Sequence, residues 1–259
     1  MIFSHAFFDL DGTIYVDGKL ISGIYNSLHK LKSSGTEIYY MTNNTSVSLS
    51  KYYEKLLLLD LPIHKNCVIS PTITLSHWLT GKNVKKFFSV GTDDFINEVC
   101  LLSDVEHDEN QPEVVVVAFD RELTYKKLQQ ACCLINRGVP WVITHIDLAC
   151  PSEQGPIPDC GSIAKVISFT TGIEPIKDFG KPSEEMTSLI RKLSTNSKSI
   201  LVAGDRSYTD AQIGINLGAE TVLVCTGEYE RGQDMKLELL DVKVEDTLSV
   251  YLDKVLVND

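Results

Sequence analysis

Two carboxylates follow the first apolar segment of the chain and are the side chains best suited to chemistry. Asp9 and Asp11 flank Leu10, and Gly12 and Thr13 come next. If a strand continues through them, its alternation puts both carboxylates on one face. Open α/β sheets bind their ligands beyond the carboxyl ends of the strands, so this pair is a candidate ligand site. The alternative is an ordinary strand that ends in an Asp-Gly turn.

A second acidic group follows another apolar segment near the far end of the sequence. Gly204 and Asp205 end that segment, and Asp210 lies at the start of a predicted helix. Carboxylate oxygens suit Mg²⁺, which typically takes one or two carboxylates together with substrate phosphate and water. The alternative is a helix-capping aspartate followed by solvated acidic residues.

Two further segments supply groups that can bind phosphate. Thr42 and Asn43 follow a predicted strand with hydroxyl and amide donors. Backbone N–H groups in the next turn can hold phosphate oxygens. Lys181, between Gly180 and Pro182, adds a positive charge before another predicted helix. Neither segment is specific alone, because a single lysine is usually solvated and Thr-Asn-Asn usually forms a turn.

The elements that must position these residues alternate between strand and helix patterns, which predicts βαβ units and a mostly parallel sheet. The predicted strands are 6–10, 37–41, 87–90, 114–119, 141–144, 199–203 and 221–225. The predicted helices are 22–34, 48–59, 124–137, 183–193 and 208–217. Residues 103–112, with four acidic residues, are expected to form a solvated loop, and residues 151–159 are too rich in Pro and Gly for regular structure.

In this order, the four groups resemble the four motifs of the haloacid dehalogenase superfamily. The resemblance covers essentially the whole chain. The long insertion between Thr42 and Lys181 looks like the large α/β cap of the NagD-like branch, which includes p-nitrophenylphosphatases. The resemblance implies a doubly wound α/β core of parallel strands, formed by residues 1–76 and 179–259. An α/β cap domain of residues 77–178 is expected to be inserted in that core.

The resemblance also implies roles for the matched residues. Asp9 is the expected nucleophile, which forms an aspartyl-phosphate, and Asp11 the expected general acid and base. The expected Mg²⁺ ligands are Asp9, Asp11 through its backbone carbonyl, Asp205, and Asp210 by way of a water. Thr42, Asn43 and Lys181 are expected to bind the phosphoryl oxygens.

In the cap, the resemblance makes His145 and Asp147 candidates for substrate specificity. Many relatives carry Asn where this chain has His145, and a glycine-rich sequence where it has Pro158–Ser162. A structural role for His145 is the alternative to a substrate contact. The expected substrate is a small phosphorylated metabolite such as a nucleotide or sugar phosphate. Two other functions stay open: a phosphotransferase using the same intermediate, and a non-catalytic phosphate-binding or regulatory protein.

Composition limits the partners and the compartment. The chain has 24 basic and 35 acidic residues, a formal net charge of −11, so a nucleic acid polymer is not an expected partner. No run approaches the roughly 20 apolar residues of a membrane span, and no signal peptide is recognisable. The odd number of cysteines, seven, favours buried thiols in a reducing compartment. We therefore expect a cytoplasmic protein, with a homodimer as an open possibility.

Overall fold

The computed structural model describes residues 3–152, 154–195, 197, 199–232 and 240–256, and its contacts group the chain into two compact units. The core unit comprises Met1–Thr42, Leu49–Ile69 and Met186–Asp259. The inserted unit comprises Asn43–Ser48 and Ser70–Glu185. The chain therefore passes between the units four times, after Thr42, Ser48, Ile69 and Glu185. The domain boundaries expected from the sequence, at 76/77 and 178/179, stay a prediction.

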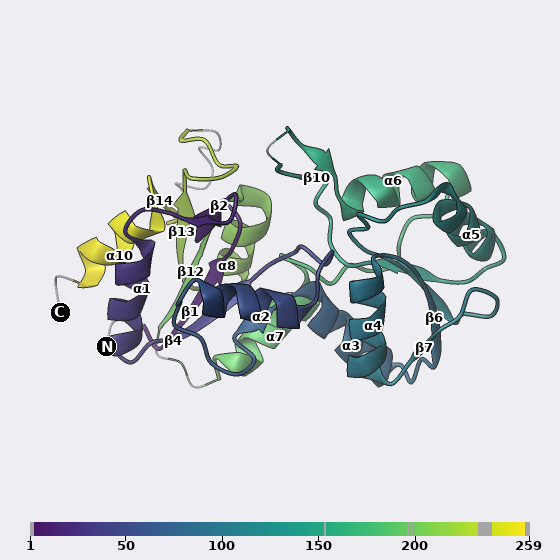
Figure 1. Ribbon diagram of the computed structural model, residues 1–259, viewed down its shortest axis with the longest axis horizontal. Coiled ribbons are helices and arrows are strands. Elements are labelled where there is room, and N and C mark those ends of the chain that lie inside the picture. The colour runs from purple at the N-terminus through teal and green to yellow at the C-terminus, as the bar shows by residue number, and fades with distance from the viewer. Residues whose placement is uncertain (1–2, 153, 196, 198, 233–239, 257–259) are drawn as a thin grey trace. The chain divides into compact units, whose positions relative to one another are not determined.

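The core unit contains a six-stranded parallel sheet in the order β14-β13-β12-β1-β4-β5 (Figure 1). Its strands are β1 (His5–Asp9), β4 (Glu37–Met41), β5 (Val68–Ile69), β12 (Ile200–Gly204), β13 (Glu220–Val224) and β14 (Lys243–Glu245). Successive strands move outward from the middle in both directions, so the point where the order reverses lies between β1 and β12. The doubly wound α/β fold expected from the sequence is confirmed.

Helices cover this sheet. Among the described residues they are α1 (Ile24–Ser33), α2 (Leu49–Leu58), α7 (Glu184–Leu193), the π-helix η1 (Ser207–Ala211), α8 (Gln212–Leu217) and α10 (Leu248–Leu256). Met186 and Ile190 are four residues apart on α7, so they share one helix face and pack with Phe7 and Val202 of the sheet. A short hairpin of β2 (Tyr15–Val16) and β3 (Lys19–Leu20) follows β1.

The inserted unit has its own four-stranded parallel sheet, in the order β7-β6-β8-β9. Its strands are β7 (Glu106–His107), β6 (Lys86–Val90), β8 (Val114–Val117) and β9 (Trp141–Ile143). The four valines of β8 are buried in alternation on its two faces. Val115 and Val117 pack in the cluster with helices α5 (Tyr125–Asn136) and α6 (Cys160–Thr171). Val114 and Val116 pack in the cluster with α3 (Pro71–Gly81) and α4 (Asp93–Ser103).

In the described part of the inserted unit, the helices α3, α4, α5 and α6 begin at polar capping residues. The side chains of Ser70, Thr92, Thr124 and Asp159 each accept a hydrogen bond from a backbone N–H in the first turn of α3, α4, α5 and α6. Such caps satisfy donors that have no partner within the helix. They fix where each helix starts and, for α6, where the preceding loop must end.

Two expectations about loops are wrong in part. Residues 103–112 include the end of α4 and the edge strand β7, and Val105 between them is buried. The acidic residues of this segment therefore led to the wrong prediction of a loop. Within 151–159, Ile157–Pro158 forms β11, which pairs antiparallel with β10 (Ala149–Cys150). Glu153 lies outside the described residues.

The predicted helix 208–217 begins as a π-helix. None of the helices described above combines the length and the apolar composition that a membrane span requires.

Candidate active site

The core unit brings three carboxylates together beside the point where the strand order reverses. In the register of β1 and β12, Phe8 lies opposite Ala203, so the residues that follow leave the sheet side by side. Asp9 ends β1, and Asp205 directly follows β12. Ligand oxygens of Asp9, Asp205 and Asp210 all lie within 4.8 Å of one another. The three residues are 8%, 3% and 1% exposed, so the cluster is buried.

Two glycines leave the space that the Asp205 carboxylate occupies in this cluster. A Cβ atom at Gly227 would lie 1.9 Å from Asp205 Oδ2, and one at Gly12 would lie 2.4 Å from it. The Glu228 backbone N–H donates to the same oxygen at 2.7 Å. The Asp205 carboxylate therefore occupies space that any larger residue at positions 12 or 227 would fill.

Asp210 is held by the π-helix that follows β12. Its Oδ2 accepts a hydrogen bond from the Arg206 backbone N–H at 3.1 Å, and its own N–H donates to the Arg206 carbonyl at 3.0 Å. A Cβ at Gly204 would lie 2.1 Å from Asp210 Cγ. Single π-helical turns occur often at functional sites because they re-aim a side chain.

This acidic group fits a divalent cation. Three buried carboxylates at this separation repel one another, and a cation relieves that repulsion. Hard carboxylate oxygens are the ligands that Mg²⁺ and Ca²⁺ prefer. The group can thus hold a divalent metal ion, and the assignment of Asp9, Asp205 and Asp210 as its ligands stays a prediction.

Asp11 lies just outside the group. β1 ends at Asp9, so strand alternation does not extend to Asp11, whose side chain is exposed. The next residues form a tight turn in which Gly12, at φ +87°, donates from its N–H to the Tyr15 carbonyl at 2.8 Å. An isolated bridge also joins Asp11 and Tyr15. The turn presents the Asp11 carboxylate to solvent, a position that suits proton transfer to and from a substrate.

Lys55 of α2 interacts electrostatically with Asp11 and is not among the site residues predicted from the sequence. Its Nζ lies 3.5 Å from the centroid of the buried Tyr15 ring, a cation–π geometry. Burial lowers the pKa of Lys55, and the negative charge of Asp11 opposes that shift. A single lysine on a predicted helix carries no local signal that would have identified this contact.

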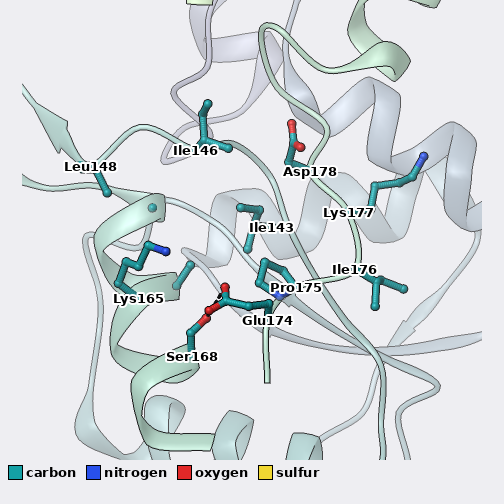
Figure 2. Close-up of a pocket in the computed structure, with 12 residues that line it drawn as sticks. Ile143, Ile146, Leu148, Lys165, Ser168, Glu174, Pro175, Ile176, Lys177 and Asp178 are labelled. Atoms are coloured by element: carbon teal, nitrogen blue, oxygen red, sulfur yellow. Dashed lines mark hydrogen bonds between the residues drawn. The ribbon is translucent and has the colours of Figure 1, made fainter. Parts of the chain in front are cut away.

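The inserted unit contains a pocket of about 380 Å³ beside α6 and β9 (Figure 2). α6 supplies Lys165 and Ser168, and the segment 174–178 lines it as well. Ser168 donates a hydrogen bond to Glu174 at 3.1 Å, and Lys177 pairs with Glu185. The lining includes two acidic residues, Glu174 and Asp178, so it is not a purely cationic phosphate site.

In the inserted unit, two hydrogen bonds join the Asn43 side chain to the backbone of Lys181. The Lys181 backbone N–H donates to Asn43 Oδ1 at 2.8 Å, and Asn43 Nδ2 donates to the Lys181 carbonyl at 3.2 Å. Nδ2 also donates to Asp147 Oδ2 at 3.1 Å. Both amide hydrogens of the Asn43 side chain are therefore used within the protein. Only its backbone N–H is left as a group to donate to a phosphate.

Thr42, the residue before Asn43, belongs to the core unit. Its backbone N–H donates to the Ile69 carbonyl at 3.0 Å, and its side chain is buried at the end of β4. The N–H of Thr42 is thus committed to the sheet. Its hydroxyl is the group that can act as a donor to a phosphate.

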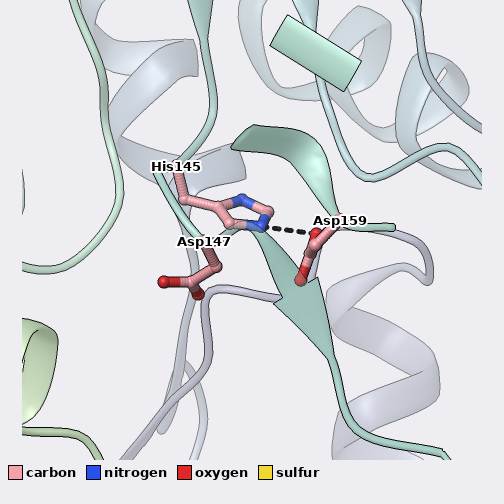
Figure 3. A group of neighbouring side chains, drawn as sticks. All are labelled: His145, Asp147 and Asp159. Atoms are coloured by element: carbon pink, nitrogen blue, oxygen red, sulfur yellow. Dashed lines mark hydrogen bonds and ion pairs between the residues drawn. The ribbon is translucent and has the colours of Figure 1, made fainter. Parts of the chain in front are cut away.

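His145, Asp147 and Asp159 form a second buried group, in the inserted unit (Figure 3). His145 is fully buried, with Nε2 2.8 Å from Asp159 Oδ1 and Nδ1 3.0 Å from Thr144 Oγ1. Asp159 Oδ1 also accepts the Cys160 N–H at 2.6 Å as the cap of α6. Since both ring nitrogens of His145 have partners in the protein, the group is a hydrogen-bond network. These contacts fit the structural alternative for His145, and its part in substrate choice stays a prediction.

Comparison with known proteins identifies the class. The family model described as haloacid dehalogenase-like hydrolase matches residues 6–102, and a second one, described as HAD-hydrolase-like, matches residues 178–249. The chain belongs to the haloacid dehalogenase-like hydrolases, in the NagD-like branch that contains p-nitrophenylphosphatases. It is accordingly a phosphatase of that family, and the resemblance expected from the four motifs is confirmed.

Three relatives show how far the likeness extends. The chain is 32% identical to the 5'-nucleotidase YutF of Bacillus subtilis, over 86% of this chain and 87% of the relative. It is 29% identical to an acid sugar phosphatase of Staphylococcus aureus, over 85% of each chain. The crystal structure of a 4-nitrophenylphosphatase from Thermotoga maritima matches with a TM-score of 0.88 and 31% identity, covering 96% of each chain.

Proposed function

We propose that this protein is a Mg²⁺-dependent phosphatase that hydrolyses a small phosphate monoester through an aspartyl-phosphate on Asp9. The observation that carries the proposal is the buried group of Asp9, Asp205 and Asp210 at the carboxyl ends of β1 and β12. This is the place where open α/β sheets bind ligands. The membership of the chain in a family of phosphatases supports the same reaction class.

In the first half-reaction, Asp9 attacks phosphorus in line with the leaving oxygen, and the bond between phosphorus and that oxygen breaks. Asp11 gives its proton to the leaving alkoxide. In the second half-reaction, Asp11 takes a proton from a water molecule, which attacks the phosphorus of the aspartyl-phosphate and frees Asp9. The exposed turn position of Asp11 suits a group that must reach both the leaving group and solvent.

Asp9, the Asp11 carbonyl and Asp205 would hold Mg²⁺, and Asp210 would orient a bound water. When bound, the ion neutralises the carboxylates and lets an anionic phosphate approach Asp9. The Thr42 hydroxyl, the Asn43 backbone N–H and the Lys181 ammonium would bind the phosphoryl oxygens. These donors matter because phosphoryl-transfer transition states spread negative charge over those oxygens.

The substrate class is a small phosphorylated metabolite, and nucleotides and sugar phosphates are the first candidates because relatives are named for them. His145 and Asp147 are 0% and 1% exposed. Their influence on substrate choice would therefore be exerted through the residues that they hold in place.

The test is phosphate release from a panel of monoesters that includes p-nitrophenyl phosphate, nucleoside monophosphates and sugar phosphates. Each ester is assayed with Mg²⁺ and with EDTA, and Asp9→Asn serves as the blank. We expect Mg²⁺-dependent release that falls by at least about 10³-fold in Asp9→Asn, because the nucleophile is removed. Substantial turnover by Asp9→Asn would refute the nucleophile assignment. Release only when a second alcohol is added would identify a phosphotransferase.

A further inference from the structure

We propose that Asp147 is a positioning residue that acts through Asn43 to fix Lys181. This inference rests on the proposed function, in which Lys181 binds the phosphoryl group. The structure supplies a continuous path of short contacts, all within the inserted unit, from the start of α6 to the backbone on both sides of Lys181.

The path begins at the loop that carries Asp147. The Gly161 backbone N–H, in the first turn of α6, donates to the Asp147 carbonyl at 2.8 Å. The Asp159 backbone N–H donates to the Leu148 carbonyl at 3.1 Å. A Cβ at Gly161 would lie 2.3 Å from the Ile146 carbonyl oxygen, so the loop lies directly against the helix. These backbone contacts with α6 hold the backbone of Asp147 in place without involving its side chain.

The side chain of Asp147 then orients the amide of Asn43. A backbone N–H can only donate, so the bond from Lys181 N–H identifies the accepting atom of Asn43 as its oxygen. The amide nitrogen must then point to its two acceptors, the Lys181 carbonyl and Asp147 Oδ2. Without the carboxylate, one of the two hydrogens on this nitrogen would lose its acceptor, in a site where Asn43 is only 6% exposed.

The two bonds from Asn43 to the Lys181 backbone limit where the Lys181 ammonium can go. One Asn43 side chain binds both the N–H and the carbonyl of Lys181, which restricts the backbone torsions from which the lysine side chain extends. Gly180 adds to this restriction, because a Cβ there would lie 2.7 Å from Asn43 Oδ1 and 2.6 Å from His145 Cβ. Displacements of about 1 Å in a group that holds a reacting phosphate can cost about 10²-fold in rate.

Asp147 is suited to positioning rather than to contact with a substrate. Its side chain is 1% exposed, and its Oδ2 is engaged by Asn43. The bond joins residues 104 positions apart in the sequence, so it ties the loop before α6 to the segment after β4.

The experiment compares Asp147→Ala, Asp147→Asn, Asn43→Ala and the double variant Asn43→Ala with Asp147→Ala. The readouts are KM and kcat for p-nitrophenyl phosphate, and the Kd for orthophosphate by titration calorimetry with Mg²⁺ present. The control is Asp120→Asn, which alters another buried carboxylate of the inserted unit, held by Lys127 and the Glu122 N–H. Melting temperatures establish that each variant is folded.

We expect Asp147→Ala to raise KM and the phosphate Kd by about tenfold, with a smaller change in kcat, because an interaction with the phosphate is weakened in both ground and transition states. Asp147→Asn keeps an oxygen that accepts from Asn43, so it should stay within about threefold of the wild type. In the Asn43→Ala background, Asp147→Ala should add less than about twofold, since its route to Lys181 is already removed. Asp120→Asn should leave KM and Kd unchanged, whatever its melting temperature.

Three results would overturn the inference. They are an unchanged Kd in folded Asp147→Ala, equal losses in Asp147→Asn and Asp147→Ala, and independent, multiplicative losses in the double variant. The calorimetric readout separates this inference from the proposed function. A wild type that binds orthophosphate but releases none from any ester would refute the phosphatase mechanism, and the comparison of Kd values would still decide the role of Asp147.

Discussion

Asn43 and His145 show how the number of donors and acceptors on one side chain limits its role. Asn43 has two amide hydrogens, and both are directed to acceptors in the protein. His145 has two ring nitrogens, and both have partners at 3.0 Å or less. By contrast, the carboxylates of Asp9, Asp205 and Asp210 converge on one another, an arrangement that a cation stabilises. Asn43 and His145 thus differ from the acidic group, in which three carboxylates approach one another.

The acidic group predicts a stabilising response to Mg²⁺. In the wild type, Mg²⁺ at about 100 times its Kd should add about 2.7 kcal/mol to the free energy of unfolding. Asp205→Asn should lose most of this gain, and in EDTA it should be at least as stable as the wild type, because one of three clustered charges is gone. Melting curves with Mg²⁺ and with EDTA measure both effects. Glu54→Gln, which changes an exposed carboxylate of the core unit, is the matched control. An equal Mg²⁺ response in Asp205→Asn would contradict the site.

Asp178 predicts a pH dependence of stability in the inserted unit. Burial, reinforced by the charge of Glu185, raises the pKa of Asp178 above its usual range. A raised carboxyl pKa means that the folded state favours the neutral form, so stability falls as pH rises from the ordinary pKa through the raised one. Asp178→Asn removes this penalty. Its melting temperature should exceed that of the wild type at pH 7, and the difference should vanish near about pH 3. The same difference at both pH values would show that the charge is not responsible.

At the scale of elements, local chemistry at the ends of helices and strands sets the site. Asp159 caps α6 and also accepts from His145, so one carboxylate joins a helix start to the loop that carries Asp147. Gly12, Gly204 and Gly227 let turns approach the acidic group closely enough that no Cβ would fit. The site is thus built by the short segments that follow strands, and the sheets hold those segments in register.

The double role of Asp159 predicts a large effect from a single cap. Asp159→Ala should lower the free energy of unfolding by about 2–4 kcal/mol. The lost cap accounts for about 1 kcal/mol, and the buried His145 nitrogen left without its partner for about 1–3 kcal/mol. Asp159→Asn keeps an accepting oxygen and should lose about 1 kcal/mol or less. Urea denaturation of both variants measures the difference. Similar losses in the two would mean that the charge, not the acceptor, matters.

The sequence predicts the elements with strong periodicity and the motifs at strand ends, because both depend on residues that are close together in the chain. Glu37–Met41 is a strand at the predicted residues, because an apolar β-rich run between turns has few alternatives. The sequence did not predict the edge strand β7, because its residues Glu106 and His107 are polar, as the residues of edge strands often are. The sequence did not predict the contact between Asn43 and Asp147 either, because the two residues are 104 positions apart and no local pattern indicates their contact.

At the scale of the whole molecule, the four chain crossings make the inserted unit discontinuous. Residues 43–48 belong to it although they directly follow a strand of the core unit. Thr45 Oγ1 accepts the buried Phe119 N–H at 3.1 Å, and the Ser46 carbonyl accepts the Thr92 hydroxyl at 3.0 Å. The longest continuous part of the unit is therefore incomplete without this short segment.

A fragment of residues 70–185 alone should be less stable than the same fragment with residues 43–48 joined by a Gly-Ser linker. Each buried donor left without an acceptor costs about 1–3 kcal/mol, and the short fragment lacks the acceptor for Phe119. Thermal melting followed by circular dichroism compares the two. A linked fragment carrying Thr45→Val should lose most of the gain. Equal melting temperatures for the long and short fragments would show that 43–48 adds nothing.

The all-valine strand β8 has a consequence for the unfolded chain. Residues 114–119 read Val-Val-Val-Val-Ala-Phe, a run with strong strand propensity and no charge, which is the composition of segments that self-associate into cross-β aggregates. In the folded protein this run is buried between two helical layers. On either side of it stand Glu113 and Asp120, charges that act as gatekeepers against stacking of identical strands. During synthesis and refolding, before α3 to α6 cover the sheet, these two carboxylates are the nearest protection the segment has against association with other copies.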